Sequence, residues 1–281
     1  MSLCDIVNTS DFGADPVKLF CRWLSDTLAH LQSSHKECDT DSGRWETLSS
    51  DYSTLSSVLA DLWKVSYAAR SKSSSAALMV APPVGMEDAY SVELSASELT
   101  DMFLEVDCVL LEPDVLALQS HALSTCREVR PAVIKYLLAL ARLRPDSILQ
   151  HLMGGGGAEA VSLAVLGVLS QAHNAEAADS VVAPALLYLR EVCLSPFLVT
   201  LVRQGLFASL EGLDPTSLSH GAAHAMADVL EACLSSGSAS LAAKLGQTKV
   251  LQVLEDALVN RFDDMVPYQN VLRRVRDLES S

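Results

Sequence analysis

The chain contains few aromatic residues: Phe, Trp and Tyr together make up 5% of its 281 residues. Sheets are usually enriched in aromatic and β-branched residues, so this shortage argues against a sheet-based fold. Hydrophobic residues still make up 49% of the chain, which is enough to bury a substantial core and excludes disorder throughout. Because Leu, Ala and Ser dominate, we expect helices packed closely on helices, an all-α fold.

Basic residues are absent from a long central stretch. Between Ser73 and Cys126 there are nine acidic residues and no Lys or Arg, in a chain whose net charge is −15. Such a stretch repels nucleic acid and anionic lipid, so neither is an expected partner. The acidic segment from Glu87 to Asp114 has two interpretations: a docking surface for a basic helix or tail of another protein, or a solvated helix face beside an acidic loop.

Long apolar runs and targeting signals are also missing. Runs such as Val161 to Leu169 are too short and too interrupted by Ser and Gly to cross a bilayer, so membrane insertion is not expected. The N-terminus has neither a basic start nor a long apolar core, which argues against a secretory signal. We expect a cytoplasmic or nuclear protein whose seven scattered cysteines stay reduced.

Motifs of common enzyme and cofactor classes are lacking as well. No cysteine pair has C-x-x-C spacing and no Gly-x-Ser-x-Gly is present. The run Gly154–Gly157 lacks the Gly-Lys-Ser/Thr of a phosphate loop, so a turn between helices explains it better. His220 and His224 have the i, i+4 spacing of a zinc pair, without an obvious third ligand. We expect no cofactor, no metal and no catalysis; an α-helical enzyme with a site near these histidines is the less favoured alternative.

Two helices are predicted near the N-terminus. Asp15 and Pro16 supply a cap and a first helical residue, and apolar residues then keep helical spacing to about Leu31. After a polar break at 33–42, a second helix runs to about Val65. The three tryptophans of the chain are expected in the core.

Composition divides the chain into three parts. Residues 1–70 are predicted to form the N-terminal helical hairpin or cap. The Ser, Pro and Gly content of 71–91 indicates a flexible linker or loop. Residues 92–281 are predicted to form a helical repeat domain, whose first helix starts at a capping box made by Ser95 and Glu98.

An internal repeat supports this division. Pro145 and Pro196 lie 51 residues apart, and each is followed nine residues later by a glycine. The stretch Glu191–Ser195 (EVCLS) recurs as Glu231–Ser235 (EACLS). Each unit is predicted to contain a short helix, a Gly bend where positive φ is tolerated, a second helix, and a third helix ending in a Leu-rich turn. The predicted units are 97–144, 145–195, 196–236 and 238–279.

The stretch Pro196–Ser235, with LVRQGLFASLEGL followed by AHAMADVLEACLSS, resembles the three-helix unit of the armadillo family. The resemblance implies a right-handed superhelical stack of armadillo-like three-helix repeats over about 97–279, with the N-terminal helical hairpin beside it. A HEAT-type or irregular helical solenoid is the alternative. Armadillo proteins that clamp extended peptides often carry an Asn ladder on their third helices. The predicted third helices here contain no Asn, so a groove of the nuclear-import type is not expected.

A repeat stack offers a long surface whose usual use is to hold other proteins. The expected function is a non-catalytic scaffold or adaptor that binds a partner protein or peptide. The alternative is a chaperone or assembly cofactor of the Hsp70-binding type, since armadillo-like cofactors of that type are of similar size. Candidate partner-binding residues on the third helices are Tyr136, Arg142, Tyr188 and Arg190. Apolar surface on the terminal units would also allow homo- or hetero-oligomers.

Overall fold

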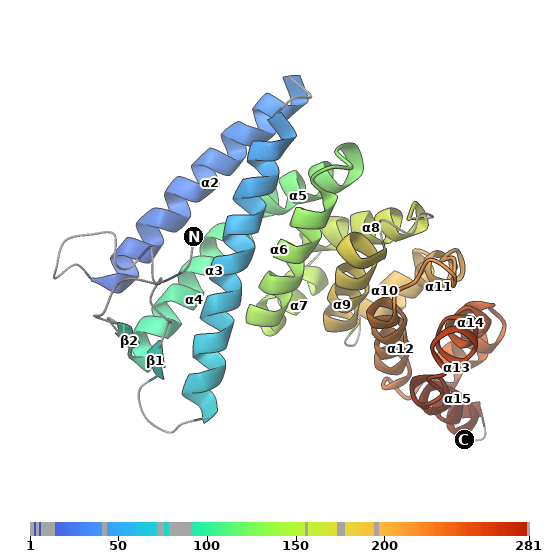
Figure 1. The fold of residues 1–281 in the computed structure, drawn as a ribbon. Helices are drawn as coiled ribbons and strands as arrows, with labels where there is room; N and C mark the ends of the chain where they lie inside the picture. The colour runs from blue at the N-terminus through green and yellow to red at the C-terminus, as the bar shows by residue number, and fades with distance from the viewer. Residues whose placement is uncertain are drawn as a thin grey trace.

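The computed structural model describes residues 3, 6, 15–40, 44–71, 76–78, 92–154, 157–172, 178–193 and 197–279. Within these residues the chain is helical apart from one two-stranded ribbon, so the predicted all-α class is confirmed. The helices follow one another as a curved row from the N-terminal to the C-terminal end (Figure 1).

The described elements, in chain order, are α2 (Pro16–Thr40), α3 (Trp45–Ser71), β1 (Ala76–Leu78), β2 (Val92–Leu94), α4 (Ala96–Leu110), α5 (Pro113–Thr125), α6 (Arg130–Leu143), α7 (Pro145–Met153), α8 (Gly157–Ser170), the π-helical turn η2 (Ala178–Val182), α9 (Ala183–Val192), α10 (Phe197–Arg203), α11 (Leu206–Glu211), α12 (His220–Leu234), α13 (Ala239–Gly246), α14 (Val250–Phe262) and α15 (Val266–Glu279).

Helices α2 and α3 form the predicted N-terminal hairpin. α2 begins where the Asp15 carboxylate accepts a hydrogen bond from the Val17 N–H at 3.0 Å, as the cap signal predicts. α3 packs along α6, and α2 packs against α4. The apolar residues of the hairpin therefore belong to the same continuous core as the helices that follow.

α2 is longer than predicted. The sequence favours a break at 33–42, but the helix continues through most of this segment. Ser34 and His35 are buried there. The Ser34 hydroxyl donates to Asp51 of α3 at 2.8 Å, and His35 Nε2 lies 2.8 Å from the hydroxyl oxygen of Tyr52. These contacts with α3 keep a polar segment helical, which local composition alone does not reveal.

The predicted linker 71–91 lies largely outside the described residues. Its described part includes β1, which pairs antiparallel with β2 so that Ala76 is opposite Leu94 and Leu78 is opposite Val92. The ribbon was not predicted because strands of three residues are too short to show an alternating pattern.

Four successive helix triplets follow the ribbon, and their bounds agree with the four predicted units: α4–α6, α7–α9, α10–α12 and α13–α15. Local signals define several of these ends. Ser95 and Glu98 form the predicted capping box at the start of α4. Pro113 begins α5, Pro145 begins α7, and Pro131 lies in the first turn of α6.

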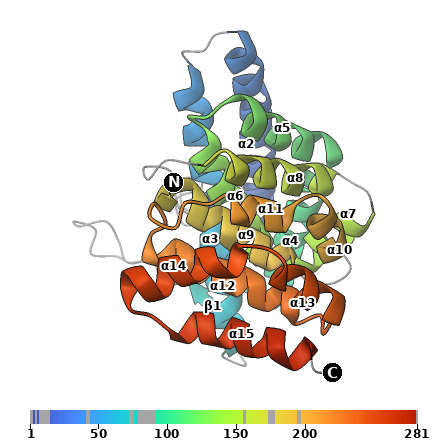
Figure 2. The same cartoon turned by 90° about the vertical axis from the view of Figure 1, so that its right-hand side faces the viewer.

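The second and third helices of each triplet pack on their counterparts in the next triplet. The third helices form one row, α6, α9, α12 and α15, which α3 extends toward the N-terminus; we call these five helices the third-helix row. α5, α8, α11 and α14 form a second row. Figure 1 shows α3, α6, α9 and α12 side by side, and Figure 2, viewed from the C-terminal end, shows α13, α14 and α15 in front.

Glycines take two different roles at the bends. Gly205, between α10 and α11, has φ of 101°, the left-handed conformation predicted for the bend. Gly154 has φ of −77°, so the same prediction is wrong there. Gly157 instead allows close packing, because a Cβ at this position would lie 2.8 Å from Cβ of Leu116 on α5. Residues 155 and 156 of the predicted flexible turn lie outside the described residues.

None of the described helices is by itself long and apolar enough to cross a membrane. α7 and α8 taken together reach the necessary length and apolarity, but they are bent by 98° at the break between them.

Candidate functional site

Arg142 and Arg190 lie at the C-terminal ends of two neighbouring helices in the third-helix row, α6 and α9. Each guanidinium is partly exposed and reaches an acidic residue on the next helix of the row. Arg142 Nε lies 3.9 Å from Glu191 Oε1 of α9, and Arg190 Nη1 lies 3.3 Å from Asp228 Oδ2 of α12. The two predicted arginines therefore occupy corresponding places in successive triplets, and both keep a face toward solvent.

Tyr136, predicted to bind a partner, is buried in the core instead. Its hydroxyl accepts a hydrogen bond from Gln119 Nε2 of α5 at 3.1 Å, and its ring centroid lies 5.3 Å from that of Tyr52 on α3. Burial raises the pKa of Tyr136 well above its ordinary value. Because the side chain reaches no solvent, Tyr136 is removed from the partner-binding surface.

Tyr188 is corrected in the same way. It is buried on α9, and its hydroxyl lies 2.9 Å from Ser162 Oγ of α8. Burial raises the pKa of Tyr188 to about 12. The prediction failed for both tyrosines because the helical register was inferred from spacing, and a helix that contacts neighbours on several sides buries more than one face.

An exposed aromatic pair on α3 was missed. Trp63 is 41% exposed and Tyr67 is 65% exposed, and their rings stack with centroids 5.7 Å apart. Trp63 was predicted to lie in the core, which is wrong. Its i, i+4 spacing to Tyr67 places both rings on one helix face, offset from the buried positions Leu59 and Leu62. Exposed aromatic residues of this kind are enriched in protein interfaces.

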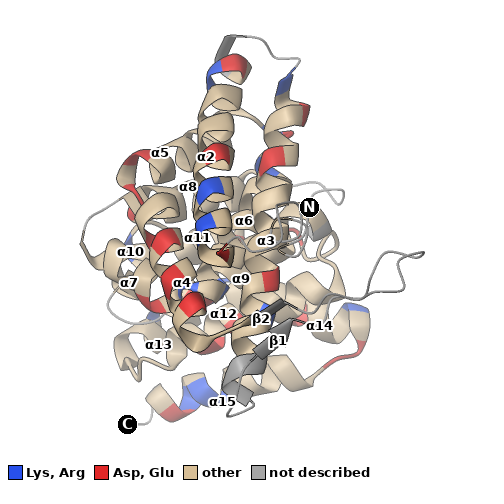
Figure 3. Ribbon diagram, turned by 90° about the vertical axis from the view of Figure 1, so that its left-hand side faces the viewer, with Lys and Arg blue, Asp and Glu red and all other residues tan. Residues whose placement is uncertain are grey.

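The acidic residues predicted as a docking segment, from Glu87 to Asp114, have two different environments: some make contacts within the fold and others face solvent. Arg144 binds Asp107 of α4 through two hydrogen bonds of 2.8 Å and 2.5 Å, and the Ser147 hydroxyl also donates to Asp107 at 2.8 Å. This partly buried cluster joins α4 to the start of α7. Asp101 is exposed and Glu105 is partly exposed, one turn further along α4, where acidic residues recur along the helix (Figure 3). The part of the prediction at Glu87 lies outside the described residues.

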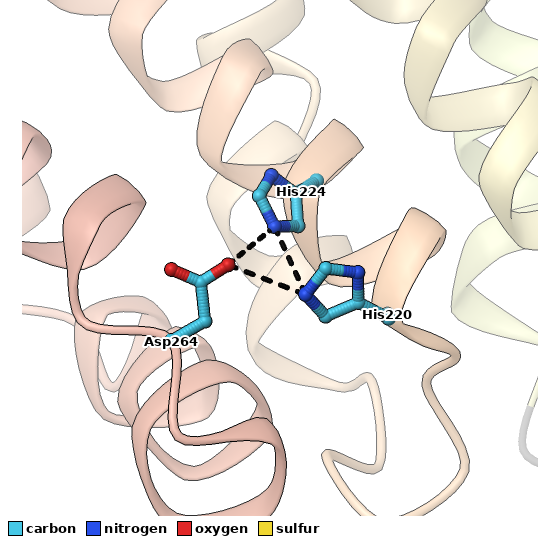
Figure 4. Close-up of side chains that lie close together, drawn as sticks. All are labelled: His220, His224 and Asp264. Atoms are coloured by element: carbon cyan, nitrogen blue, oxygen red, sulfur yellow. Dashed lines mark hydrogen bonds and ion pairs between the residues drawn. The ribbon is translucent and has the colours of Figure 1, made fainter.

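His220 and His224 converge on a third side chain, Asp264, from the turn before α15 (Figure 4). Asp264 Oδ2 lies 2.7 Å from His224 Nε2 and 3.2 Å from His220 Nε2, and the two Nε2 atoms lie 3.2 Å apart. Sequence reasoning found the histidine pair but missed Asp264, which is 40 residues beyond His224.

The turn before α15 fixes the position of Asp264. Asp263 ends α14 in the left-handed conformation, with φ of 53°. The Asp264 N–H then donates to the Leu258 carbonyl at 2.9 Å, and its Oδ1 accepts the Val266 N–H at 3.3 Å. The ring of Phe262 packs edge-on against His220, with centroids 5.0 Å apart. The carboxylate is therefore held in place by backbone contacts independent of the histidines.

Opposing effects act on the pKa of Asp264. Desolvation raises this pKa, but hydrogen bonds from His224, the Val266 N–H and His220 together outweigh it. The net pKa lies below the ordinary value, so the carboxylate is ionised at neutral pH.

No family model, curated protein or solved structure matches this chain. Functional conclusions therefore depend on the residues and contacts described above.

Proposed function

We propose that the chain is a non-catalytic scaffold that binds a partner protein or peptide on its third-helix row, and that its triplets form an armadillo-like right-handed superhelical stack. Three features support the armadillo-like arrangement. The helices group in threes, the second and third helices of successive triplets pack on their counterparts, and one continuous core runs through all the triplets. Such a stack presents one helix of every unit along the same surface.

The observation that carries the binding proposal is the repeated placement of Arg142 and Arg190. Each has a partner acid on the next helix, but distances of 3.9 Å and 3.3 Å between partly exposed groups make weak ion pairs, worth about 0–1 kcal/mol each. A guanidinium has five N–H donors, so each arginine retains donors for carboxylates or backbone carbonyls of a bound segment. The exposed pair Trp63 and Tyr67 supplies apolar contact area at the α3 end of the row.

A basic helix or tail of the partner has a separate place to dock. Asp101, which is exposed, and Glu105, which is partly exposed, lie one turn apart on α4, in the stretch that contains no Lys or Arg. Asp107 is excluded from this role because Arg144 and Ser147 already bind it. Contacts with exposed acids affect association rate and salt dependence more than affinity.

The double variant Arg142→Gln/Arg190→Gln tests the proposal. Neutral Gln avoids the repulsion that Glu would meet beside Glu191 and Asp228, so the fold and melting temperature should be unchanged. We expect partner affinity to fall at least about tenfold. Quantitative affinity capture from cells, followed by binding measurements with the captured protein after purification, gives the comparison.

The matched control is Lys18→Gln/Arg22→Gln on α2. It also removes two exposed cations that make weak pairs, with Asp15 and Asp26. Equal retention of every captured protein by both double variants would contradict the assignment of the surface to Arg142 and Arg190.

A further inference from the structure

The cluster of His220, His224 and Asp264 has the composition and geometry of a metal site. We propose that these residues bind one Zn²⁺ ion through the two Nε2 atoms and Asp264 Oδ2, and that the ion joins the third helix triplet to the fourth. The proposal does not depend on the scaffold function.

Distances within the cluster fit a tetrahedral ion. With zinc–ligand bonds of about 2.0–2.1 Å, the ligand atoms of a tetrahedral site lie about 3.3 Å from one another. The Nε2–Nε2 distance and the distance from His220 Nε2 to Asp264 Oδ2 are both 3.2 Å. The distance from His224 Nε2 to the same oxygen is 2.7 Å, so binding requires this edge to widen by about half an ångström.

The donor set selects a transition metal. Two imidazole nitrogens with one carboxylate oxygen suit Zn²⁺, whereas Mg²⁺ and Ca²⁺ take oxygen ligands. A neutral imidazole carries one N–H, so when its Nδ1 holds the proton its Nε2 presents a lone pair. Without an ion, a histidine Nε2–H can donate to Asp264; with the proton on Nδ1 instead, the two Nε2 lone pairs and one carboxylate lone pair are available to bond a single cation.

The ligands are positioned before any ion arrives. His220 and His224 occupy successive turns of α12, where i, i+4 spacing brings side chains together. Asp264 is fixed independently by its N–H bond to the Leu258 carbonyl and by the Val266 N–H that it accepts. Little ordering is therefore needed on binding, which favours affinity.

The site is open on one side. The side chains of His220, His224 and Asp264 are 54%, 41% and 23% exposed. An ion held by these three ligands has a fourth position for water or for a donor atom from another molecule, while its protein ligands connect α12 to the turn between α14 and α15. We expect the ion to hold the last triplet against the rest of the row.

Zinc titration of the full chain, freed of metal with a chelator, tests the proposal. We expect one equivalent of Zn²⁺ to bind with a Kd of about 1 µM or tighter, measured by competition with a chromophoric chelator. A hundredfold excess of zinc over Kd should raise the melting temperature by about 5 °C. Co²⁺ in place of Zn²⁺ should give the visible absorption of a tetrahedral complex.

Two isosteric variants and two controls make the test specific to these ligands. Asp264→Asn and His224→Gln should each weaken zinc binding more than about tenfold and abolish the thermal shift. Asp263→Asn changes the net charge equally, and Asn tolerates the left-handed backbone there, so its zinc binding should be unchanged. His30→Gln removes a histidine that contacts one carboxylate, Asp51, and should also leave zinc binding unchanged.

Three outcomes would overturn the proposal. The first is the absence of a saturable equivalent of zinc. The second is equal zinc affinity in Asp264→Asn and Asp263→Asn, which would leave the carboxylate without a role. The third is retention of the zinc in His224→Gln, which would place the ion elsewhere, for example on cysteine thiols. Circular dichroism of each variant confirms that helix content is intact.

Discussion

Tyr136 and Tyr188 have the same role in successive triplets. Each is buried on a third helix, and each hydroxyl bonds to a polar side chain on the second helix of its own triplet, Gln119 or Ser162. The two pairs differ in what else the polar partner contacts. The Ser162 hydroxyl also donates to the Ala158 carbonyl at 3.0 Å, whereas Gln119 Oε1 has no hydrogen-bond partner among the described residues.

This difference predicts unequal effects when the hydroxyls are removed. Tyr188→Phe should lower the free energy of unfolding by about 1 kcal/mol, because Ser162 keeps its second hydrogen bond. Tyr136→Phe should cost more, up to about 3 kcal/mol, because it leaves the whole Gln119 amide buried without a partner. Urea denaturation followed by circular dichroism measures both.

A second substitution shows whether Tyr136→Phe loses stability because the Gln119 amide is left without a partner or because packing is lost. Adding Gln119→Leu to Tyr136→Phe replaces both polar partners with apolar groups, so most of the lost stability should return. Two results would contradict this explanation: an equal decrease in the free energy of unfolding for Tyr136→Phe and Tyr188→Phe, or no regain of stability when Gln119→Leu is added to Tyr136→Phe.

At this scale the sequence singled out two of the three residues of the His220, His224 and Asp264 cluster, and two of the four candidate partner-binding residues lie on the surface. His220 and His224 stand out because their spacing is local. Asp264 does not, because its position depends on a left-handed residue that reverses the chain after α14. Arg142 and Arg190 remain on the surface as predicted. Tyr136 and Tyr188 do not, since burial depends on which neighbours surround a helix, and spacing along the chain does not report that.

At the scale of helices, ends were predicted well where a local signal exists. Proline in the first turn marks α5, α6 and α7, and a capping box marks α4, because these residues act on the backbone beside them. The end of α2 was not predicted, because Ser34 and His35 are held in the helix by residues of α3. Long-range contacts of this kind leave no trace in local composition.

The capping box of α4 gives a prediction that depends on pH. Hydrogen bonds from the Ser95 hydroxyl and backbone N–H lower the pKa of Glu98. A lowered folded-state pKa contributes stability above the unfolded-state pKa of Glu98, and this stability is lost as the pH falls through the folded-state value. Ser95→Ala should therefore cost about 1 kcal/mol at neutral pH and less in acid.

Urea unfolding of the wild type and of Ser95→Ala at a series of pH values from neutral to acid measures this difference. Ser97→Ala is the control, because it changes a neighbouring serine and leaves the bond between Ser95 and the Glu98 N–H in place. A difference between wild type and Ser95→Ala that stays constant over the whole pH range would contradict a role for ionised Glu98.

For the whole molecule, the repeated proline and glycine positions, the recurrence of EVCLS as EACLS and the capping box at Ser95 together predicted unit bounds that agree with those of the helix triplets. Each triplet is one continuous segment of the chain, so its signals lie close together in sequence. The relation between triplets is different, because it depends on which faces pack together. Trp63 was placed in the core for a similar reason, because its exposure depends on which faces of α3 are covered by neighbours, whereas the ribbon of β1 and β2 was missed because three-residue strands show no alternating pattern.

The third-helix row as the partner-binding surface is the central claim for the whole molecule. Ala139 and Leu187 each lie one turn before a surface arginine, Arg142 or Arg190, and both are partly exposed. A photo-crosslinking amino acid at either position would contact whatever occupies the row. Ala29, exposed on α2, is the control position.

Photo-crosslinking of these three variants in cells, followed by mass spectrometry of the adducts, tests that claim most directly. We predict that Ala139 and Leu187 give adducts with the same partner protein, that Ala29 does not, and that adding Arg142→Gln/Arg190→Gln removes the adducts. A partner that crosslinks equally from Ala29, or only from Ala29, would contradict binding on the third-helix row.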